Sequence, residues 1–358
     1  MSQQTAQFIN AIDTTPSQPE DCGLGHACNF CPQENSCQLD KTIHNTTLVQ
    51  NRLQGINWII LVMANKGGIG KSTVAANLAV ALAEQGYSVG LGDADVHGPN
   101  APRILGLQDA RVKVSHNGIS TPRYQFNDNK TVQVGSLGFF LEQVDTPVVW
   151  RDSYKHDYIH HLIGSFYWGA LDFLVIDMPP GTGNELITLT DMLEGSNLRS
   201  LLVSSADAIA LQDSLKAARF SLDKKIPILG LVENYAGTVC PHCGGEINLF
   251  PRADEIDEFE SMGIHTLARI PFSPDIAQGA SKGCPAAGDT NTVIGEIFAD
   301  LAKGCKEAAV ADAQGLKADL AASFSGMEID IAEISNGNPE LQAQLEGLIV
   351  QEKQHLAS

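Results

Sequence analysis

The sequence is short of positive charge and contains no long apolar run. It has 23 lysines and arginines against 42 aspartates and glutamates, which gives a formal net charge of −19. A chain this acidic repels duplex nucleic acid and anionic lipid unless it carries a local basic patch, and the sequence has no such patch. No stretch approaches the ~20 consecutive apolar residues that a membrane span needs. We therefore expect no nucleic-acid partner and no membrane partner.

The first twenty residues also lack the apolar h-region of a secretory signal peptide. We therefore expect a cytoplasmic protein. In a reducing compartment, the eight cysteines are better suited to binding metal than to forming disulfides. The length of 358 residues permits one large domain or two ordinary ones, and a hydrophobic content of 43 % suffices for a real core.

A phosphate-binding loop is the strongest signal in the chain. The apolar run 58–64 predicts a buried strand, the turn 65–70 is rich in glycine, and an apolar-periodic helix follows to about Gly86. Glycines let backbone N–H groups surround phosphate oxygens, and a helix N-terminus favours bound anions. The lysine of the motif would neutralise the β- and γ-phosphates, and its serine hydroxyl would ligate Mg²⁺. The predicted ATP site comprises Gly67, Gly68, Ile69, Gly70, Lys71, Ser72 and Thr73.

Two further predicted strands end in carboxylates. Residues 88–92 lead into Asp93 and Asp95, and the apolar run 171–177 ends at Asp177. Acidic residues at the carboxyl ends of strands beside a phosphate-binding loop lie where ligands bind in open α/β sheets. One carboxylate can orient the attacking water, and Asp177 is predicted to hold the water shell of Mg²⁺. The alternation of strands and helices predicts a doubly wound, mostly parallel α/β sheet.

Four cysteines within sixteen residues form a second candidate site, at Cys22, Cys28, Cys31 and Cys37. Their segment is too short and too polar to bury a core of its own, so we expect a metal to organise it. Four thiolates fit a [4Fe–4S] cluster or a single zinc ion, although the second C-x2-C pair of a zinc ribbon is missing. We favour the iron–sulfur cluster and keep zinc and free thiols as alternatives.

Cys240 and Cys243 form half of a third candidate metal site. Two thiolates cannot complete a four-ligand site, so the other ligands must come from Cys284, Cys305, the N-terminal cysteines or a second subunit. A two-fold axis would bring two such pairs together around one cluster. We favour this shared [4Fe–4S] cluster over zinc and over dithiol redox chemistry. Two glycines follow the pair, whereas a redox C-x-x-C motif typically opens a helix.

These motifs, in this order, resemble the Mrp/ApbC family of P-loop iron–sulfur carrier ATPases over residues 55–305. The second lysine of the loop is similar to that of the deviant P-loop ATPases, and it implies that Lys66 reaches the nucleotide of a partner subunit in a homodimer. With Lys71 and Mg²⁺, it would offset charge on the transferring phosphoryl group. The family also implies that Asp95 positions the attacking water and that Asn234 reads the adenine edge. The N-terminal cysteine segment is similar to that of the eukaryotic cytosolic scaffold branch.

We divide the chain into a cysteine-rich segment (1–45), a P-loop ATPase domain of the nitrogenase-iron-protein type (50–305) and a helical C-terminal extension (306–358), with a polar connector from Lys41 to Gly55. The resemblance implies an ATP-hydrolysing carrier that assembles a labile [4Fe–4S] cluster at a homodimer interface and transfers it to apo iron–sulfur proteins. The alternative is an ATP-dependent electron-transfer protein resembling the nitrogenase iron protein, in which the cluster stays bound. Paired cysteines disfavour that alternative, because the nitrogenase iron protein uses isolated cysteines.

Overall fold

A computed structural model describes residues 25–28, 31, 33–39, 41–127, 129–141, 152–181, 183–240, 242–243, 245–251 and 253–326. Cys22 and the last part of the C-terminal extension lie outside these ranges. The chain divides into two compact units, residues 1–305 and 306–358. The helix α10 (Val293–Gly326) begins in the first unit and continues into the second.

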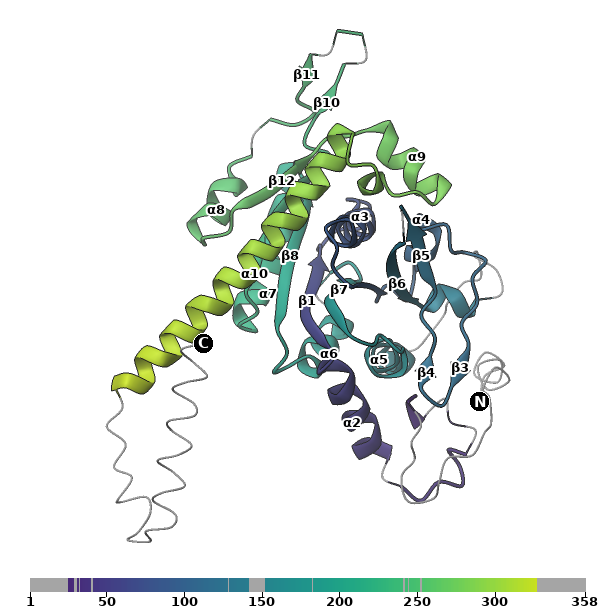
Figure 1. Cartoon of the computed structure of the whole chain (residues 1–358). Helices are drawn as coiled ribbons and strands as arrows, with labels where there is room; N and C mark the ends of the chain where they lie inside the picture. Colours follow the sequence, from purple (N-terminus) through teal and green to yellow (C-terminus); the bar gives the residue numbers. More distant parts are fainter. Residues whose placement is uncertain are drawn as a thin grey trace. The chain divides into compact units, whose positions relative to one another are not determined.

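An eight-stranded sheet organises the first unit (Figure 1). Its strands are β1 (Ile56–Met63), β2 (Val89–Asp93), β5 (Arg123–Phe126), β6 (Lys130–Ser136), β7 (Leu171–Asp177), β8 (Leu198–Ser205), β9 (Ile228–Asn234) and β12 (Thr266–Ile270). They lie in the order β12-β9-β8-β1-β7-β2-β6-β5, and every neighbouring pair is parallel except β5 with β6. The central strands are almost wholly buried, which explains their continuous apolar sequences. The predicted mostly parallel α/β sheet is confirmed.

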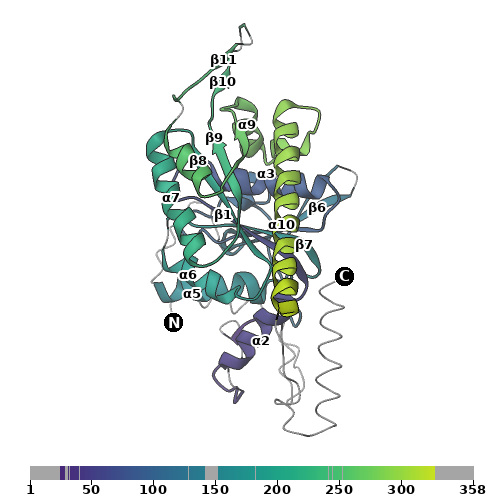
Figure 2. The same ribbon diagram turned by 90° about the vertical axis from the view of Figure 1, so that its left-hand side faces the viewer.

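Helices cover both faces of this sheet. The helices around the sheet are α3 (Lys71–Glu84), α4 (Ala101–Ile104), α5 (Asp152–His160), α6 (Asn184–Met192), α7 (Ala208–Asp223) and α8 (Glu255–Ser261), and α9 (Pro274–Lys282) packs on α4. Figure 2 shows α3 on one side of the strands and α5 and α6 on the other. α3 contacts five strands and also η4 (Ala286–Gly288), so this alanine-rich helix is buried nearly all round. None of the helices within the described ranges has the length and apolar character that a bilayer crossing requires.

Residues 41–53 form a helix, α2 (Lys41–Leu53), where the sequence predicted a polar connector, and that prediction was wrong. The helix buries Leu48 and Val49 and contacts η3 (His161–Ser165), the helical turn before β7. The segment is polar on average, and its few apolar residues find their packing surface on a distant segment. At its end, Arg52 donates to the carbonyl oxygens of Gly25 (3.0 Å) and Gly164 (3.2 Å). α2 thereby ties the N-terminal cysteine segment to the sheet domain.

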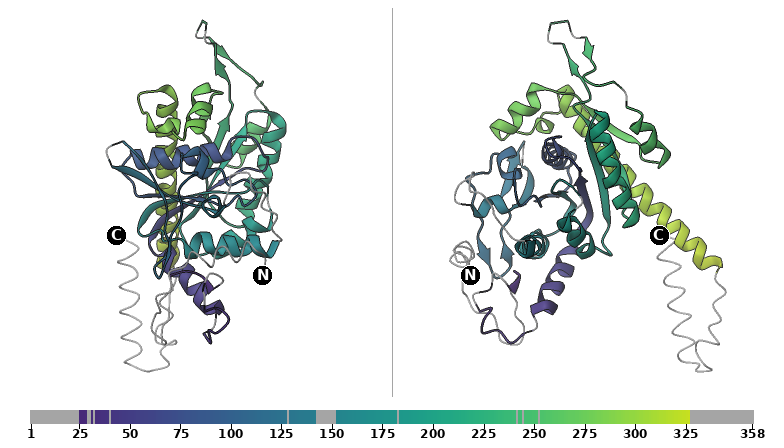
Figure 3. Two further views of the ribbon diagram at one scale, coloured as in Figure 1. Left: turned by 90° about the vertical axis from the view of Figure 1, so that its right-hand side faces the viewer. Right: turned by 180° about the vertical axis from the view of Figure 1, so that it is seen from behind.

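The two cysteine sites lie at opposite ends of the parallel strands. The loop after β1 and the segment after β9 both leave from the carboxyl ends of these strands. The hairpin of β10 (Thr238–Val239) and β11 (Glu246–Ile247) extends beyond the carboxyl ends (Figure 3). α2 precedes β1 and lies at the amino ends of the strands (Figures 1 and 3). The phosphate-binding loop therefore lies at the same end of the strands as the hairpin, and α2 lies at the other end.

Candidate nucleotide and metal sites

The loop between β1 and α3 has the backbone of a phosphate-binding turn. Gly68 and Gly70 have φ angles of 80° and 85°, which residues with a Cβ atom rarely adopt. Gly70 is also the N-cap residue of α3, so the unpaired N–H groups of the first helical turn open toward the loop. Glycine is thus required at two of the predicted nucleotide-binding positions.

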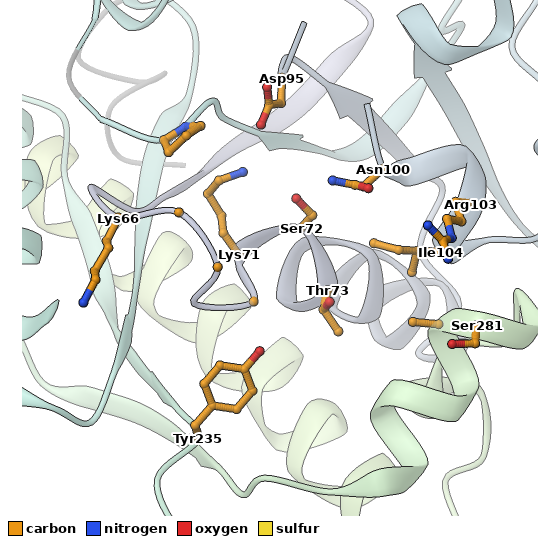
Figure 4. Close-up of a pocket in the computed structure, with 15 residues that line it drawn as sticks. Lys66, Lys71, Ser72, Thr73, Asp95, Asn100, Arg103, Ile104, Tyr235 and Ser281 are labelled. Atoms are coloured by element: carbon orange, nitrogen blue, oxygen red, sulfur yellow. The ribbon is translucent and has the colours of Figure 1, made fainter. Parts of the chain in front are cut away.

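A cavity of about 390 Å³ lies at this loop (Figure 4). Figure 4 shows Lys71 and Ser72 pointing toward Asp95, whereas Lys66 extends away from them. The structure therefore brings together most of the predicted ATP site. The predicted residues that line the cavity are Lys66, Gly67, Gly68, Gly70, Lys71, Ser72, Thr73 and Asp95.

Lys71 and Asp177 form a buried ion pair between the loop and the end of β7. Their side chains are 7 % and 1 % exposed. The other carboxylate oxygen, Asp177 Oδ2, is buried and has no hydrogen-bond partner among the described residues. An unpaired buried oxygen costs free energy, and a hydrated Mg²⁺ ion would satisfy it. The donors of Ser72 and Asp177 therefore suit the Mg²⁺ site that the sequence predicted.

Asp93 is fully buried and lies opposite Asp177 in the β2–β7 pair. Its Oδ2 accepts hydrogen bonds from Ser136 Oγ (3.0 Å) and from the N–H of Ala101 (3.1 Å). Burial, reinforced by the charge of Asp177, raises the pKa of the Asp93 carboxyl to about 8. Asp93 is therefore mostly protonated at neutral pH, and its bonds fix the start of α4 rather than present a charge to a ligand.

Asp95 is the carboxylate of this segment that lines the cavity. Its Oδ1 accepts hydrogen bonds from the N–H groups of His97 (3.1 Å) and Gly98 (3.2 Å). This turn fixes the side chain, as a residue that orients water requires. The water-positioning role of Asp95 stays a prediction.

A hydrogen bond joins Asn234 to the phosphate-binding loop. The Nδ2 of Asn234 donates to the carbonyl oxygen of Ile69 at 2.7 Å, and the side chain is 4 % exposed. Neither Asn234 nor Ile69 lines the cavity, so these two predicted residues shape the loop in this structure. Contact of Asn234 with adenine stays a prediction.

Four polar residues of the cavity are missing from the sequence prediction. They are Asn100 before α4, Arg103 of α4, Tyr235 after β9 and Ser281 of α9. Arg103 and Ser281 lie outside the motifs that predicted the site, and folding brings them to the loop. Asn100 directly follows the predicted segment that contains Asp93 and Asp95, and Tyr235 directly follows Asn234, so these two residues had a signal beside them in the sequence.

Cys240 and Cys243 lie at the tip of the β10–β11 hairpin. Cys240 is partly exposed and Cys243 is exposed. Hydrogen bonds from the N–H groups of His242 and Cys243, and then from the Cys243 thiol, lower the pKa of Cys240. A cysteine that ionises readily is suited to metal binding. The sequence interpretation of this pair as metal ligands is therefore chemically consistent with the hairpin.

Cys284 and Cys305 lie apart from the hairpin. Cys284 is exposed and lines a different cavity, with Tyr124 and Phe126. Cys305 lies within α10, where burial raises the pKa of the thiol to about 12. In the described part of the chain, no three cysteine, histidine or acidic side chains already form a group that could hold a metal ion. The described residues of one chain therefore do not complete a metal site at the hairpin.

The N-terminal cysteines line a small cavity of about 10 Å³ beside α2. Cys28, Cys31 and Cys37 contribute to it, together with His26 and His44. Three of the four predicted ligands thus come together, although the segment must rearrange before they can coordinate a metal. The fourth predicted ligand, Cys22, lies outside the described residues.

A mostly parallel α/β sheet with this loop after its first strand, and acidic residues after neighbouring strands, defines a P-loop NTPase. The family model described as the ParA group, "NUBPL iron-transfer P-loop NTPase", matches residues 55–305. The chain belongs to this family. The Mrp/ApbC resemblance inferred from the motifs is thereby confirmed.

Named relatives agree with this assignment. An iron–sulfur cluster carrier protein of Aquifex aeolicus is 36 % identical over 255 residues, which cover 71 % of this chain and 68 % of the relative. A cytosolic Fe–S cluster assembly factor, the NUBP2 homolog of Dictyostelium discoideum, is 38 % identical over 225 residues, or 63 % of this chain and 84 % of the relative. A nucleotide-binding protein from Archaeoglobus fulgidus, solved in complex with ADP, matches with a TM-score of 0.58 and 30 % identity. That match covers 71 % of this chain and 96 % of the solved one.

Proposed function

We propose that this chain is an ATP-dependent carrier of iron–sulfur clusters that works as a homodimer. It would hold a labile [4Fe–4S] cluster on Cys240 and Cys243 of both subunits and transfer it to apo iron–sulfur proteins. One observation carries the proposal: a single strand, β9, reaches both sites. Its last residue, Asn234, binds the phosphate-binding loop, and the cysteine hairpin begins at Thr238. The printed names of the relatives, which are cluster carriers, support the same reading.

The root of the hairpin is packed against the segment after β12. Phe272 N–H donates to the Gly237 carbonyl oxygen at 2.6 Å, and Thr238 Oγ1 donates to the Phe272 carbonyl oxygen at 2.9 Å. The rings of Tyr235 and Phe272 lie 5.8 Å apart, centroid to centroid. Because Tyr235 also lines the nucleotide cavity, a shift of this ring on ATP binding would reach the hairpin. Two sites can be coupled only through an element that has two states, and we assign that role to this root.

ATP is the proposed ligand of the cavity. Lys71 and the loop N–H groups would bind its phosphates, and Ser72 with Asp177 would hold Mg²⁺, which supplies positive charge near the transferring phosphoryl group. Asp95 would orient the attacking water. Lys66 extends away from Lys71 (Figure 4), as a residue that reaches a partner's nucleotide would. Together these residues make the chain a candidate ATP hydrolase.

Exposed apolar side chains beside the hairpin favour self-association there. Ile247, Leu249 and Phe250 are 45 %, 43 % and 38 % exposed, and Phe272 is 54 % exposed. Neighbouring large apolar side chains on a surface are typical of protein interfaces. A two-fold axis at this place would cover them and bring four thiolates together.

Anaerobic cluster reconstitution followed by transfer to an apo-ferredoxin tests the proposal. The wild-type protein should bind a [4Fe–4S] cluster at the hairpin, elute as a dimer and pass the cluster to the ferredoxin. Cys240→Ser and Cys243→Ser should each lose this cluster and keep the N-terminal one. Cys284→Ser changes an exposed cysteine outside the hairpin, so it is the matched control and should behave as wild type.

Two results would count against the carrier function. One is a Cys240→Ser chain that still dimerises around a complete hairpin cluster, since the shared site would then be wrong. The other is a cluster that stays bound while ATP drives reduction of the ferredoxin. That second result would select the electron-transfer alternative.

A further inference from the structure

The residues that line the nucleotide cavity differ in charge from the chain as a whole. The chain has 42 acidic residues and 23 basic residues. Among the described residues that line the cavity, three are basic (Lys66, Lys71 and Arg103) and one is acidic (Asp95). A local excess of positive charge in an acidic protein favours an anionic ligand at that place.

Arg103 is the basic residue of this cavity whose charge no neighbour balances. Lys71 forms the buried ion pair with Asp177, and Lys66 extends away from Lys71 (Figure 4). The guanidinium group of Arg103 has neither a hydrogen-bond partner nor an ion-pair partner in the described part of the chain. Because an arginine side chain stays protonated in proteins, this group is available as a permanent cation to an anion that enters the cavity.

The backbone that carries Arg103 is fixed at both ends of α4. The N–H of Ala101 donates to Asp93 Oδ2 at 3.1 Å, where the helix begins. Just after the helix, Gly106 lies against Gly283 at the end of α9, and a Cβ atom at Gly106 would be 3.2 Å from Gly283 Cα. The other three residues of α4 are buried, whereas Arg103 is exposed. The fold thus presents this one side chain of the helix at the cavity.

Arg103 lies at the cavity on the side opposite Lys66. Figure 4 shows Arg103 and Ser281 on one side, Lys66 on the other side, and Lys71 and Ser72 between them. In phosphate-binding loops, the motif lysine and the backbone N–H groups hold the phosphates from the loop. A guanidinium group on a different element can bind phosphate oxygens from another direction, through two parallel N–H···O bonds.

We infer that Arg103 is a nucleotide-binding residue whose guanidinium group donates hydrogen bonds to phosphate oxygens of the bound nucleotide. This inference rests on the proposed function, which assigns ATP to the cavity. The contact joins α4 to the ligand, and because α4 follows the segment of Asp95, it also ties that segment to the phosphates. Nucleotide affinity then depends on a charge that lies outside the phosphate-binding motif.

Calorimetric titration of the full chain with ADP tests the inference through a series of charges at one position. Arg103→Ala should weaken ADP binding about 10- to 30-fold, since a charge-assisted hydrogen bond is lost. Arg103→Lys keeps the charge without the planar fork and should bind with intermediate affinity, and Arg103→Glu should bind most weakly. The loss in Arg103→Ala should be smaller at about 0.5 M salt than at about 0.05 M, because salt screens an ionic contact.

Arg111 provides the matched control. It is an exposed arginine that does not line the cavity, and its Nη1 donates to the carbonyl oxygens of Gln108 (3.2 Å) and Ala110 (2.9 Å). Arg111→Ala and Arg111→Glu change the net charge by the same amounts as the Arg103 variants, and both should bind ADP within about twofold of wild type. Thermal unfolding without nucleotide shows whether each variant is folded, and Arg103→Gln, which keeps most of the aliphatic stem, replaces Arg103→Ala if that variant is not.

The other outcomes separate this inference from the proposed function. ADP affinity in Arg103→Ala within about twofold of wild type, or an equal loss in the Arg111 variants, overturns the role of Arg103. A loss that is the same at both salt concentrations, or the same in Arg103→Ala and Arg103→Glu, overturns the phosphate contact, because it indicates a contact with an uncharged part of the nucleotide. A wild-type chain that binds neither ADP nor ATP overturns the proposed nucleotide site itself.

Discussion

Removal of the Lys71 ammonium group should destabilise the nucleotide-free protein strongly. Lys71→Ala would leave both carboxylate oxygens of Asp177 without a partner among the described residues, at a position that is 1 % exposed. Breaking a buried ion pair from one side costs about 3–5 kcal/mol, because the remaining charge stays out of water. Asp93 lies opposite Asp177 and offers no positive charge in compensation. We therefore expect the free energy of unfolding to fall by about 3–5 kcal/mol.

A double variant separates this effect from nucleotide binding. Lys71→Ala with Asp177→Asn removes the stranded charge, so most of the lost stability should return, and a deficit of about 1–2 kcal/mol should remain from imperfect hydrogen bonding. ATP binding, measured by calorimetry, should be abolished in the single and the double variant. Urea unfolding at pH 7 without nucleotide gives the free energies. A Lys71→Ala chain within about 1 kcal/mol of wild type, or a double variant less stable than the single one, would refute the reasoning.

The nucleotide-free fold should become less stable as pH rises from about 4 to about 8, because Asp93 titrates differently in the two states. In this range the carboxyl group of Asp93 has lost its proton in the unfolded chain, whereas the folded chain, in which the pKa is about 8, still holds it. Asp93→Asn should remove this contribution, so urea-derived stability should change more favourably with rising pH across that window than in the wild type, and an unchanged slope would contradict the assignment. Asn234→Ala removes the donor to the Ile69 carbonyl, so ADP affinity measured by calorimetry should fall about 5- to 30-fold, the equivalent of roughly 1–2 kcal/mol. Cys305 should escape alkylation by iodoacetamide at pH 8 in the folded protein, because burial raises its thiol pKa to about 12, while exposed Cys243 and Cys284 react; mass spectrometry showing early labelling of Cys305 would disagree.

The sheet and the centre of the nucleotide site were predictable because their signals are local. A buried strand, a glycine turn and a helix follow one another directly around Lys71, and an apolar run that ends at Asp177 predicts β7. Each of these signals depends on neighbours in the sequence, so no knowledge of the fold was needed to read it.

The features that the sequence did not predict depend on distant contacts. α2 exists because Leu48 and Val49 find a surface at η3, more than a hundred residues further along the chain. Ser281 lies at the cavity because α9, which follows β12, packs near the phosphate-binding loop, and its own position in the sequence did not predict a contact with nucleotide. Secondary-structure propensity and the periodicity of apolar residues describe single elements. They do not predict which elements contact one another in the fold.

The two cysteine sites lie at opposite ends of the parallel strands, and this separation limits how an iron–sulfur cluster could be passed from one site to the other. β1 has eight residues and therefore spans about 26 Å, with α2 at one end and the phosphate-binding loop at the other, and the cysteine hairpin follows β9 at the same end as the loop. Ligand exchange requires the incoming and outgoing sulfurs to bind the same iron atom, and this separation keeps the two sites of one chain apart. Exchange between them would therefore involve a second chain, either the partner subunit of the proposed homodimer or a separate molecule, and only the route through separate molecules should become faster with protein concentration.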